Sequence, residues 1–400
     1  MDNMSEATSK SAQIWRILAI FMPTVFLAVL GWFFYLNKNE LISSAKSANL
    51  VVNLLVNNPT VISTSSADSA PEIEVKKREK SSRKIVKGIY LTASSGSDSK
   101  KIQEIIALID KTELNAVVID IKDYTGYVLY DSQVKEVMEL KTKHILLRDI
   151  PALITKLHDH NIYVIARQTV FQDPVLAQKK PAWAIKNKQG GIWRDHKGLS
   201  WVDITNQAVW DYNLAIAKEA IALGFDEVNF DYVRFPTDGN MSSAVMPKST
   251  ERNATMAEFF NFLSEGLRDE PAYISVDFFG LVMENNTGMS IGQKLDSAVS
   301  AVDFISPMMY PSHYAKGHLG LNNPAANPGR VIDNGMKLGL PAFKDKRAQV
   351  RPWLQAFNIG AVYGAKNIRA QIDMVEKYPN AGWLLWNAAN RYTIAGLKTE

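Results

Sequence analysis

The chain has 400 residues, of which 46% are hydrophobic and 22% are charged, and its formal net charge is +4 at pH 7. These are the proportions of an ordinary globular protein, and the small positive charge does not favour a nucleic-acid binder. Because the chain has no cysteine, disulfide bonds and thiolate metal sites are excluded.

An apolar segment near the N-terminus predicts a membrane anchor. Residues 17–36 read ILAIFMPTVFLAVLGWFFYL, twenty residues without a charge. A helix of that length spans about 30 Å, the thickness of the hydrocarbon core. The stretch exceeds the apolar region of a signal peptide, so we expect an uncleaved transmembrane helix. Residues 1–16 then form a cytoplasmic tail, and the rest of the chain lies outside the cytoplasmic membrane of the cell.

A linker separates this anchor from the folded part of the chain. Residues 61–84 are rich in Ser, Lys and Glu, and the run from Lys76 to Lys87 has seven Lys or Arg against one Glu. We interpret residues 37–84 as a solvated stalk, with contact to the membrane surface as an alternative for the basic run. The folded domain is expected at residues 85–400.

Short β-branched runs then alternate with amphipathic stretches. The predicted strands are 87–93, 116–123, 162–170, 227–235, 273–280, 303–311, 350–357 and 382–388, and the predicted helices are 99–112, 149–160, 206–223, 254–269, 291–301, 328–338 and 364–377. Seven helices between eight strands predict an α/β fold, the (β/α)₈ TIM barrel. An open doubly wound sheet is the rival, but no G-x-G-x-x-G motif follows the first strand.

Polar residues lie near the ends of several predicted strands, where TIM barrels build their active sites. The candidates for substrate binding in and just beyond strands are Asp120, Lys122, Asp123, Arg167, Asn229, Arg234, Tyr310, His313, Trp386 and Asn387. A single buried Asp–Arg pair is often structural. So many polar groups at one end of the strands favour a site.

The fourth and fifth predicted strands each carry one aspartate. Alternation places Asn229, Asp231 and Val233 on one face, and Asp277 shares a face with Ser275 and Phe279. Adjacent strands lie about 4.8 Å apart, so Asp231 and Asp277 can approach the roughly 5–5.5 Å separation of retaining glycosidases.

Glycoside hydrolysis requires two carboxyl groups in different states. One must be ionised to attack or stabilise the sugar cation, and the other must hold a proton for the leaving oxygen. A cation such as Arg234, Lys122 or Arg167 would favour the charged form of one of them, and like-charge repulsion would favour the protonated form of the other.

The loop after the third strand, about 171–205, is long and rich in aromatics. Trp183, Trp193 and Trp201 are candidate surfaces for stacking on sugars, and Asp203 is a further binding candidate. Packing of the loop onto the barrel is the alternative for each ring. Asp120, Asp123, His196, Asp203 and Asp231 could also ligate a hard cation. The chain has no HExxH, EF-hand loop or close His pair, so we expect no metal and no cofactor.

Residues 86–395 resemble a bacterial family described as a putative glycosyl hydrolase domain. The matching stretches include KGIYLTA, GFDEVNFDYVRFPTDG, SVDFFG and ISPMMYPSHY. The resemblance implies a TIM barrel with glycoside hydrolase-like architecture. It also implies Asp231 as the nucleophile on strand four and Asp277 as the acid/base on strand five. Glycosidase pairs often include a Glu, and here the strand-five residue is the shorter Asp.

The sequence therefore predicts a membrane-anchored glycoside hydrolase that cleaves O-glycosidic bonds of an envelope or extracellular polysaccharide. Its expected partners are carbohydrate and, through the N-terminal helix, the membrane. The alternative is a barrel that binds and organises envelope glycans without hydrolysing them.

Overall fold

The computed structural model describes residues 79–80, 82 and 85–399. The expected cytoplasmic tail, transmembrane anchor and most of the stalk lie outside these residues, so they stay predictions. Among the helices of the described residues, none is both long enough and apolar enough to cross a membrane.

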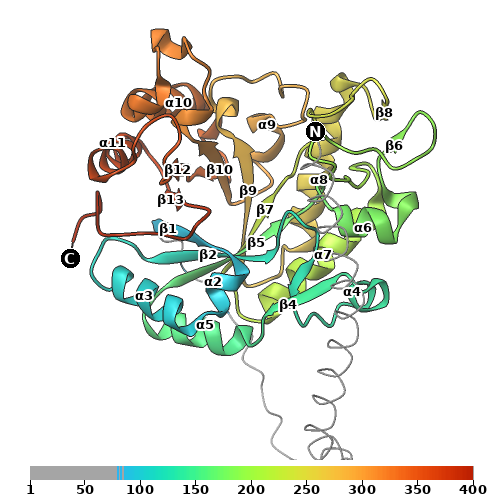
Figure 1. Cartoon of the computed structure of the whole chain (residues 1–400), viewed down its shortest axis with the longest axis horizontal. Helices are drawn as coiled ribbons and strands as arrows, with labels where there is room; N and C mark the ends of the chain where they lie inside the picture. The colour runs from blue at the N-terminus through green and yellow to red at the C-terminus, as the bar shows by residue number, and fades with distance from the viewer. Residues whose placement is uncertain (1–78, 81, 83–84, 400) are drawn as a thin grey trace, which may run out of the picture. The chain divides into compact units, whose positions relative to one another are not determined.

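Eight parallel strands form a closed barrel at the centre of the domain (Figure 1). They are β1 (Val86–Leu91), β2 (Ala116–Lys122), β5 (Tyr163–Thr169), β7 (Glu227–Asp231), β9 (Tyr273–Phe279), β10 (Phe304–Met309), β12 (Trp353–Gln355) and β13 (Gly382–Trp386). Strand β1 pairs with β2 on one side and with β13 on the other, which closes the sheet. The predicted TIM barrel is confirmed, and each of its eight strands falls within or close to a predicted range.

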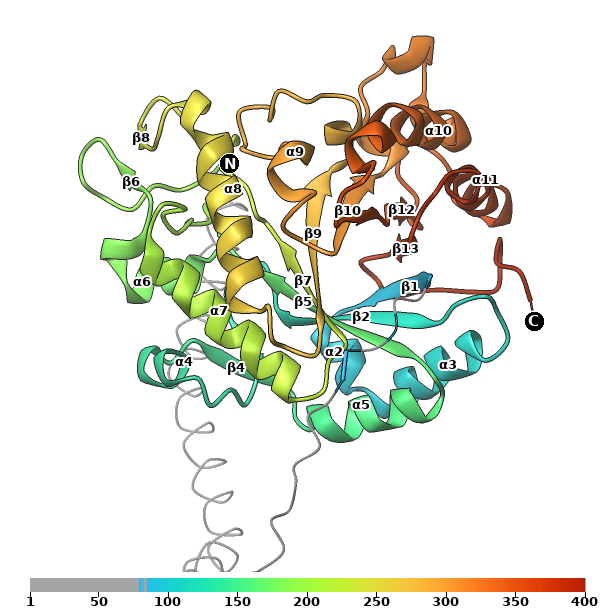
Figure 2. The ribbon, with the colours of Figure 1, turned by 180° about the vertical axis from the view of Figure 1, so that it is seen from behind.

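Helices surround the barrel on the outside, as the two opposite views show (Figures 1 and 2). Those that were predicted are α3 (Ser99–Ile109), α5 (Ile150–Asp159), α7 (Gln207–Ala222), α8 (Ser249–Gly266), α9 (Leu295–Ala298), α10 (Pro328–Gly339) and α11 (Ala365–Glu376). Smaller elements decorate this plan: α2 (Ala93–Ser97), α4 (Lys135–Leu140), α6 (Pro174–Lys179), β3 (Val128–Tyr130), β4 (Lys143–Leu147), β6 (Lys186–Asn187), β8 (Ala244–Val245) and β11 (Gln349–Val350).

Local chemistry explains where two of these helices begin. Helix α8 starts five residues before its predicted start at 254, because the Glu251 carboxylate accepts the backbone N–H of Lys248 at 3.2 Å. Helix α9 is much shorter than the predicted 291–301. Met289, Ser290 and Gly292 have positive φ angles, so the chain cannot be helical there.

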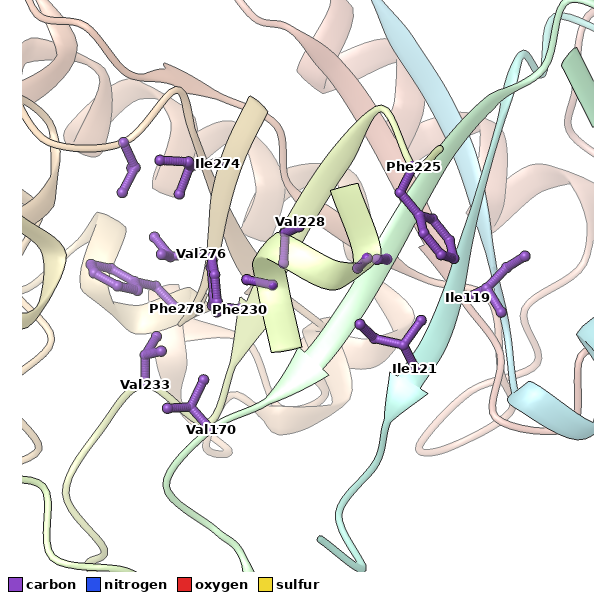
Figure 3. Close-up of a cluster of buried hydrophobic side chains, with 14 of the residues drawn as sticks. Ile119, Ile121, Val170, Phe225, Val228, Phe230, Val233, Ile274, Val276 and Phe278 are labelled. Atoms are coloured by element: carbon purple, nitrogen blue, oxygen red, sulfur yellow. The ribbon is translucent and has the colours of Figure 1, made fainter. Parts of the chain in front are cut away.

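The core has two layers that follow the alternation of the strands. One layer fills the barrel interior and includes Tyr90, Ile165 and Trp353. The other lies between strands and helices, and Figure 3 shows part of it, with Val228 and Phe230 of β7 near Val276 and Phe278 of β9. Asn229 and Asp231 of β7 and Asp277 of β9 alternate with these residues along their strands, so they face the barrel interior.

A β-bulge overturns the expected placement of Lys122. The pairing of β2 with β5 shifts between Asp120, which pairs with Arg167, and Lys122, which pairs with Gln168. The bulge inserts one residue and so turns Lys122 away from the barrel axis. Lys122 is fully buried there, donating to the Thr169 carbonyl at 2.7 Å and pairing with Asp173 at 2.8 Å.

The expected face of Val233 is also wrong. Strand β7 ends at Asp231 because Tyr232 adopts a left-handed conformation with φ of 53°. This residue breaks the alternation, so Val233 joins the outer layer beside Val170 (Figure 3). A left-handed tyrosine costs about 1–3 kcal/mol, and such strain is common beside functional sites.

Closure of the barrel depends on Gly382, which gives a first prediction. Gly382 has φ of +96°, and a Cβ there would lie 1.9 Å from the Val86 carbonyl oxygen of the neighbouring strand. Gly382→Ala is expected to lower the free energy of unfolding by more than the roughly 1–2 kcal/mol that left-handed backbone alone costs. Gly190→Ala is the matched control, because Gly190 has φ of +83° and nothing within 4 Å of a Cβ. Equal losses in urea unfolding would contradict the steric argument.

Candidate active site

Asp231 and Asp277 stand side by side at the C-terminal end of the barrel. Strands β7 and β9 are parallel neighbours, and Phe230 pairs with Val276. The next residue on each strand is an aspartate that faces the interior, so the two carboxyl groups lie at the same depth. This confirms the expectation that strands four and five adjoin with their aspartates in register.

Arg167 of β5 links three carboxyl groups at this level. Its Nη1 donates to Asp120 at 2.5 Å, its Nη2 forms an ion pair with Asp231, and its Nε lies 3.8 Å from Oδ2 of Asp277. Asp231 also accepts the backbone N–H of Tyr232 at 2.6 Å. One guanidinium therefore orients both members of the aspartate pair, and burial of the pair places each charge in the field of the others.

Asp277 occupies the most secluded position of the three and is 1% exposed. Its Oδ1 accepts two hydrogen bonds, from Asn229 Nδ2 at 2.9 Å and from Trp353 Nε1 at 2.8 Å. Burial, together with the negative charge of Asp231, raises the pKa of Asp277 to about 8, although Arg167 acts in the opposite direction. Asp277 is therefore mainly protonated at neutral pH.

Asp120 of β2 forms a buried ion pair with Arg167. Burial raises the pKa of Asp120, against the opposing effect of Arg167. Tyr90 donates its hydroxyl to Asp120 at 2.5 Å and stacks on Trp386, with ring centroids 3.8 Å apart. The Arg167 guanidinium lies 5.0 Å from the centre of the Trp386 ring, a cation–π contact. Asp120, Tyr90 and Trp386 thus fix the position of the guanidinium.

A cavity of about 550 Å³ opens above the aspartate pair. It is lined by Arg167, Lys197, Asp231, Tyr232, Arg234, Asp277, Phe279, Gly280, Leu281, Gln293, Met308, Tyr310, His313, Tyr314, Trp353 and Trp386. This volume is in the range of small-molecule sites, and aromatic walls with a few polar groups suit a sugar ring.

The structure brings together about half of the residues singled out in the sequence. Asp231, Asp277, Arg167, Arg234, Tyr310, His313 and Trp386 line the cavity, and Asp120 and Asn229 contact residues that line it. Burial lowers the pKa of the His313 imidazole. These residues come from β2, β5, β7, β9 and β13 and from the segments that follow β7 and β10.

The remaining candidates do not line the cavity, although Trp201 contacts Arg234, which does. Trp193 and Trp201 are buried and donate their indole N–H groups to the Asn240 carbonyl and to Asp195. Trp183 packs against the outer core, and the Lys180 ammonium lies 5.4 Å from the centre of its ring.

Lys122 pairs with Asp173, as described above. The other three polar candidates make local hydrogen bonds. Asp123 and Asp203 each accept from the threonine two residues later, at Thr125 and Thr205. Asn387 donates to the Ala356 carbonyl at 2.7 Å.

Sequence reasoning missed the two aromatic residues that hydrogen-bond the buried carboxyl groups, Tyr90 and Trp353. Tyr90 donates to Asp120, and Trp353 donates to Asp277. The available signal was their place on predicted strands, since buried tyrosine and tryptophan usually find a polar partner for their O–H or N–H.

The described residues contain no group of three or more His, Asp or Glu side chains that could hold a metal ion. The acidic side chains at the cavity are instead bound to Arg167, Asn229, Tyr90 and Trp353.

Comparison with known proteins gives a family and a fold. Residues 88–392 match the family described as "Putative glycosyl hydrolase domain". A hypothetical protein from Ruminiclostridium thermocellum is 37% identical, covering 47% of this chain and 96% of its own, with a TM-score of 0.44. The PgaB (BpsB) glycoside hydrolase domain from Bordetella bronchiseptica is 12% identical, covering 76% of this chain and 94% of its own, with a TM-score of 0.56. No curated protein matches the sequence.

Proposed function

Because the chain belongs to the putative glycosyl hydrolase domain family, we propose that its barrel hydrolyses O-glycosidic bonds with Asp231 and Asp277. One observation carries this proposal. Two aspartates on adjacent strands share Arg167 at the floor of a cavity; Asp231 forms an ion pair with it, and burial raises the pKa of Asp277 to about 8. Pairs of carboxyl groups driven into different protonation states are the mark of acid/base division of labour.

Asp277 is the proton donor in this proposal. Its Oδ1 already accepts two hydrogen bonds, so the proton resides on Oδ2. From there it passes to the glycosidic oxygen as the bond between that oxygen and the anomeric carbon breaks. The leaving sugar thus departs as a neutral alcohol, which is why an acid is needed.

Asp231 is the negative partner of the developing sugar cation. Arg167 and the Tyr232 N–H hold its two oxygens, which leaves each oxygen a second lone pair for substrate. The carboxylate either bonds to the anomeric carbon or stabilises its positive charge while water attacks. In both cases one water molecule is consumed, and Asp277 recovers its proton.

The substrate proposed here is an envelope or extracellular polysaccharide, reached from a membrane anchor at residues 17–36. Support for the location is the charge-free, twenty-residue apolar segment. Protease accessibility of the barrel on intact cells would test the location, since a cytoplasmic barrel would be protected.

The direct test is hydrolysis by the full-length chain, purified in detergent, on a panel of polysaccharides. Wild type is expected to release reducing ends from at least one glycan, and the variants Asp231→Asn and Asp277→Asn are not. Turnover that persists in both variants would rule out the pair.

The pH dependence of the reaction follows from the pKa of Asp277. The acid works only when protonated, so kcat/KM is expected to fall by about tenfold per pH unit above a pH of about 8. Residual activity of Asp277→Asn should lack this alkaline limb. If kcat/KM falls over the same alkaline pH range in wild type and in Asp277→Asn, the titrating group is not Asp277.

Glycan binding without hydrolysis is the second candidate. The low solvent exposure of the two aspartates favours it, because Asp231 is 5% exposed and Asp277 is 1% exposed. Saturable binding of a glycan by wild type with no product released, even at high enzyme concentration, would select this function over hydrolysis.

A further inference from the structure

Arg234 is a second arginine at the cavity, and its surroundings differ from those of Arg167. It follows β7, lines the cavity and is only 8% exposed. Its guanidinium lies 4.8 Å from the ring centre of Trp201 and 4.9 Å from that of Phe279. Contacts with these two aromatic rings fix the position of the guanidinium.

The charge of Arg234 is not balanced by an ion pair within the described residues. Its guanidinium donates to the Phe235 carbonyl at 3.0 Å, and no carboxylate of the described residues lies within 4.0 Å of its nitrogens. Burial lowers the pKa of Arg234, and Asp238, Tyr232, Asp231 and Asp195 act in the opposite direction from farther away. The other deeply buried cations, Arg167, Arg351 and Lys122, each have a carboxylate partner.

Lys197 adds a second positive charge to the same cavity. It is exposed, lines the cavity, and forms no ion pair in the part of the chain that the structure describes. The two carboxyl groups that line the cavity do not neutralise these charges, because Asp231 is bound to Arg167 and burial raises the pKa of Asp277. Burying a cation without a partner is costly, so an anionic group from a ligand would complete this site.

We propose that the cavity selects an acidic glycan, whose oxyanion substituent binds Arg234, with Lys197 attracting it from the cavity edge. The proposal rests on the function proposed above and names its substrate class. An arginine held by aromatic rings presents its N–H groups in a fixed plane, the arrangement that recognises a carboxylate or phosphate. The oxyanion is the carboxylate of a hexuronic acid or the phosphate of a phosphorylated sugar.

Matched pairs of glycans test this selectivity. One pair is a hexuronate oligosaccharide and its carboxyl-reduced form; the other is a phosphorylated oligosaccharide and its dephosphorylated form. Binding is measured by calorimetry on the full-length chain carrying Asp277→Asn, so that no glycan is consumed. The acidic member of one pair is expected to bind about 10- to 100-fold more tightly than its neutral counterpart, as for a charged hydrogen bond. The pair that shows the difference identifies the oxyanion.

Variants assign the preference to Arg234. Adding Arg234→Gln should abolish it, Arg234→Lys should retain part of it, and Lys197→Gln should weaken it more at low salt than at high salt. Thermal unfolding of each variant reports whether the fold is intact, and Arg234→Lys keeps the test open if Arg234→Gln does not fold. Equal binding of both members in both pairs, no binding of an acidic member, or a preference that survives Arg234→Gln would overturn the proposal.

Failure of this proposal can be told apart from failure of the hydrolase. Neutral glycans hydrolysed as fast as acidic ones by the wild-type chain would refute the acidic substrate and leave the aspartate pair standing. Acidic glycans that bind selectively but are never cleaved would refute hydrolysis by the aspartate pair and leave the acidic ligand standing.

Discussion

Asp277→Asn is expected to lower kcat by about 10²- to 10⁴-fold on an unactivated glycan, the usual contribution of a general acid. Asparagine preserves the shape of the side chain and can still accept the hydrogen bonds of Asn229 and Trp353. The loss therefore reports the missing proton rather than a collapsed site.

The leaving group provides the control for this prediction. An aryl glycoside with an acidic phenol departs without protonation, so Asp277→Asn should retain far more of the wild-type rate on it than on the glycan. Asp231→Asn should impair both substrates, because both form a cationic sugar. Equal losses on the two substrates for Asp277→Asn would exclude its role as the acid.

Arg351→Met is expected to reduce the free energy of unfolding by about 3–5 kcal/mol, the cost of leaving a buried charge unpaired. Arg351 and Glu227 are both fully buried inside the barrel, where they form an ion pair. Tyr163 also donates to Glu227 at 3.2 Å, and Ser275 donates to its other oxygen. Urea unfolding measured against wild type gives the change.

A variant that removes both charges tests whether the lost stability comes from the unpaired carboxylate of Glu227. The double variant Arg351→Met with Glu227→Gln should recover most of the lost stability, since no unpaired charge remains. If the double variant is no more stable than Arg351→Met alone, the loss comes from packing around the Phe304 ring, which lies 4.3 Å from the guanidinium.

The barrel and its central pair could be predicted because both depend on regular alternation. In a strand, side chains two residues apart share a face, so Asn229 and Asp231 on one strand, and Ser275 and Asp277 on the next, could be assigned to the interior. The confirmed register then brought the two aspartates together. Their different environments could not be predicted, because the pKa of Asp277 depends on burial and on contacts from distant strands.

The errors occurred where the backbone departs from that alternation. The bulge after Asp120 turned Lys122 outward, and the left-handed Tyr232 moved Val233 to the outer layer. Neither departure has a glycine or proline to signal it. The tryptophans of the long loop present a different difficulty. An indole that packs a loop, as Trp193 and Trp201 do, has the same sequence signature as one that stacks on sugar.

The most direct test of the aspartate pair is a crystal structure of the Asp277→Asn variant with an uncleaved oligosaccharide. We predict an anomeric carbon about 3–3.5 Å from a carboxylate oxygen of Asp231, with the glycosidic oxygen facing the side chain at position 277. A sugar bound elsewhere, or one whose anomeric carbon neither side chain can reach, would contradict the account.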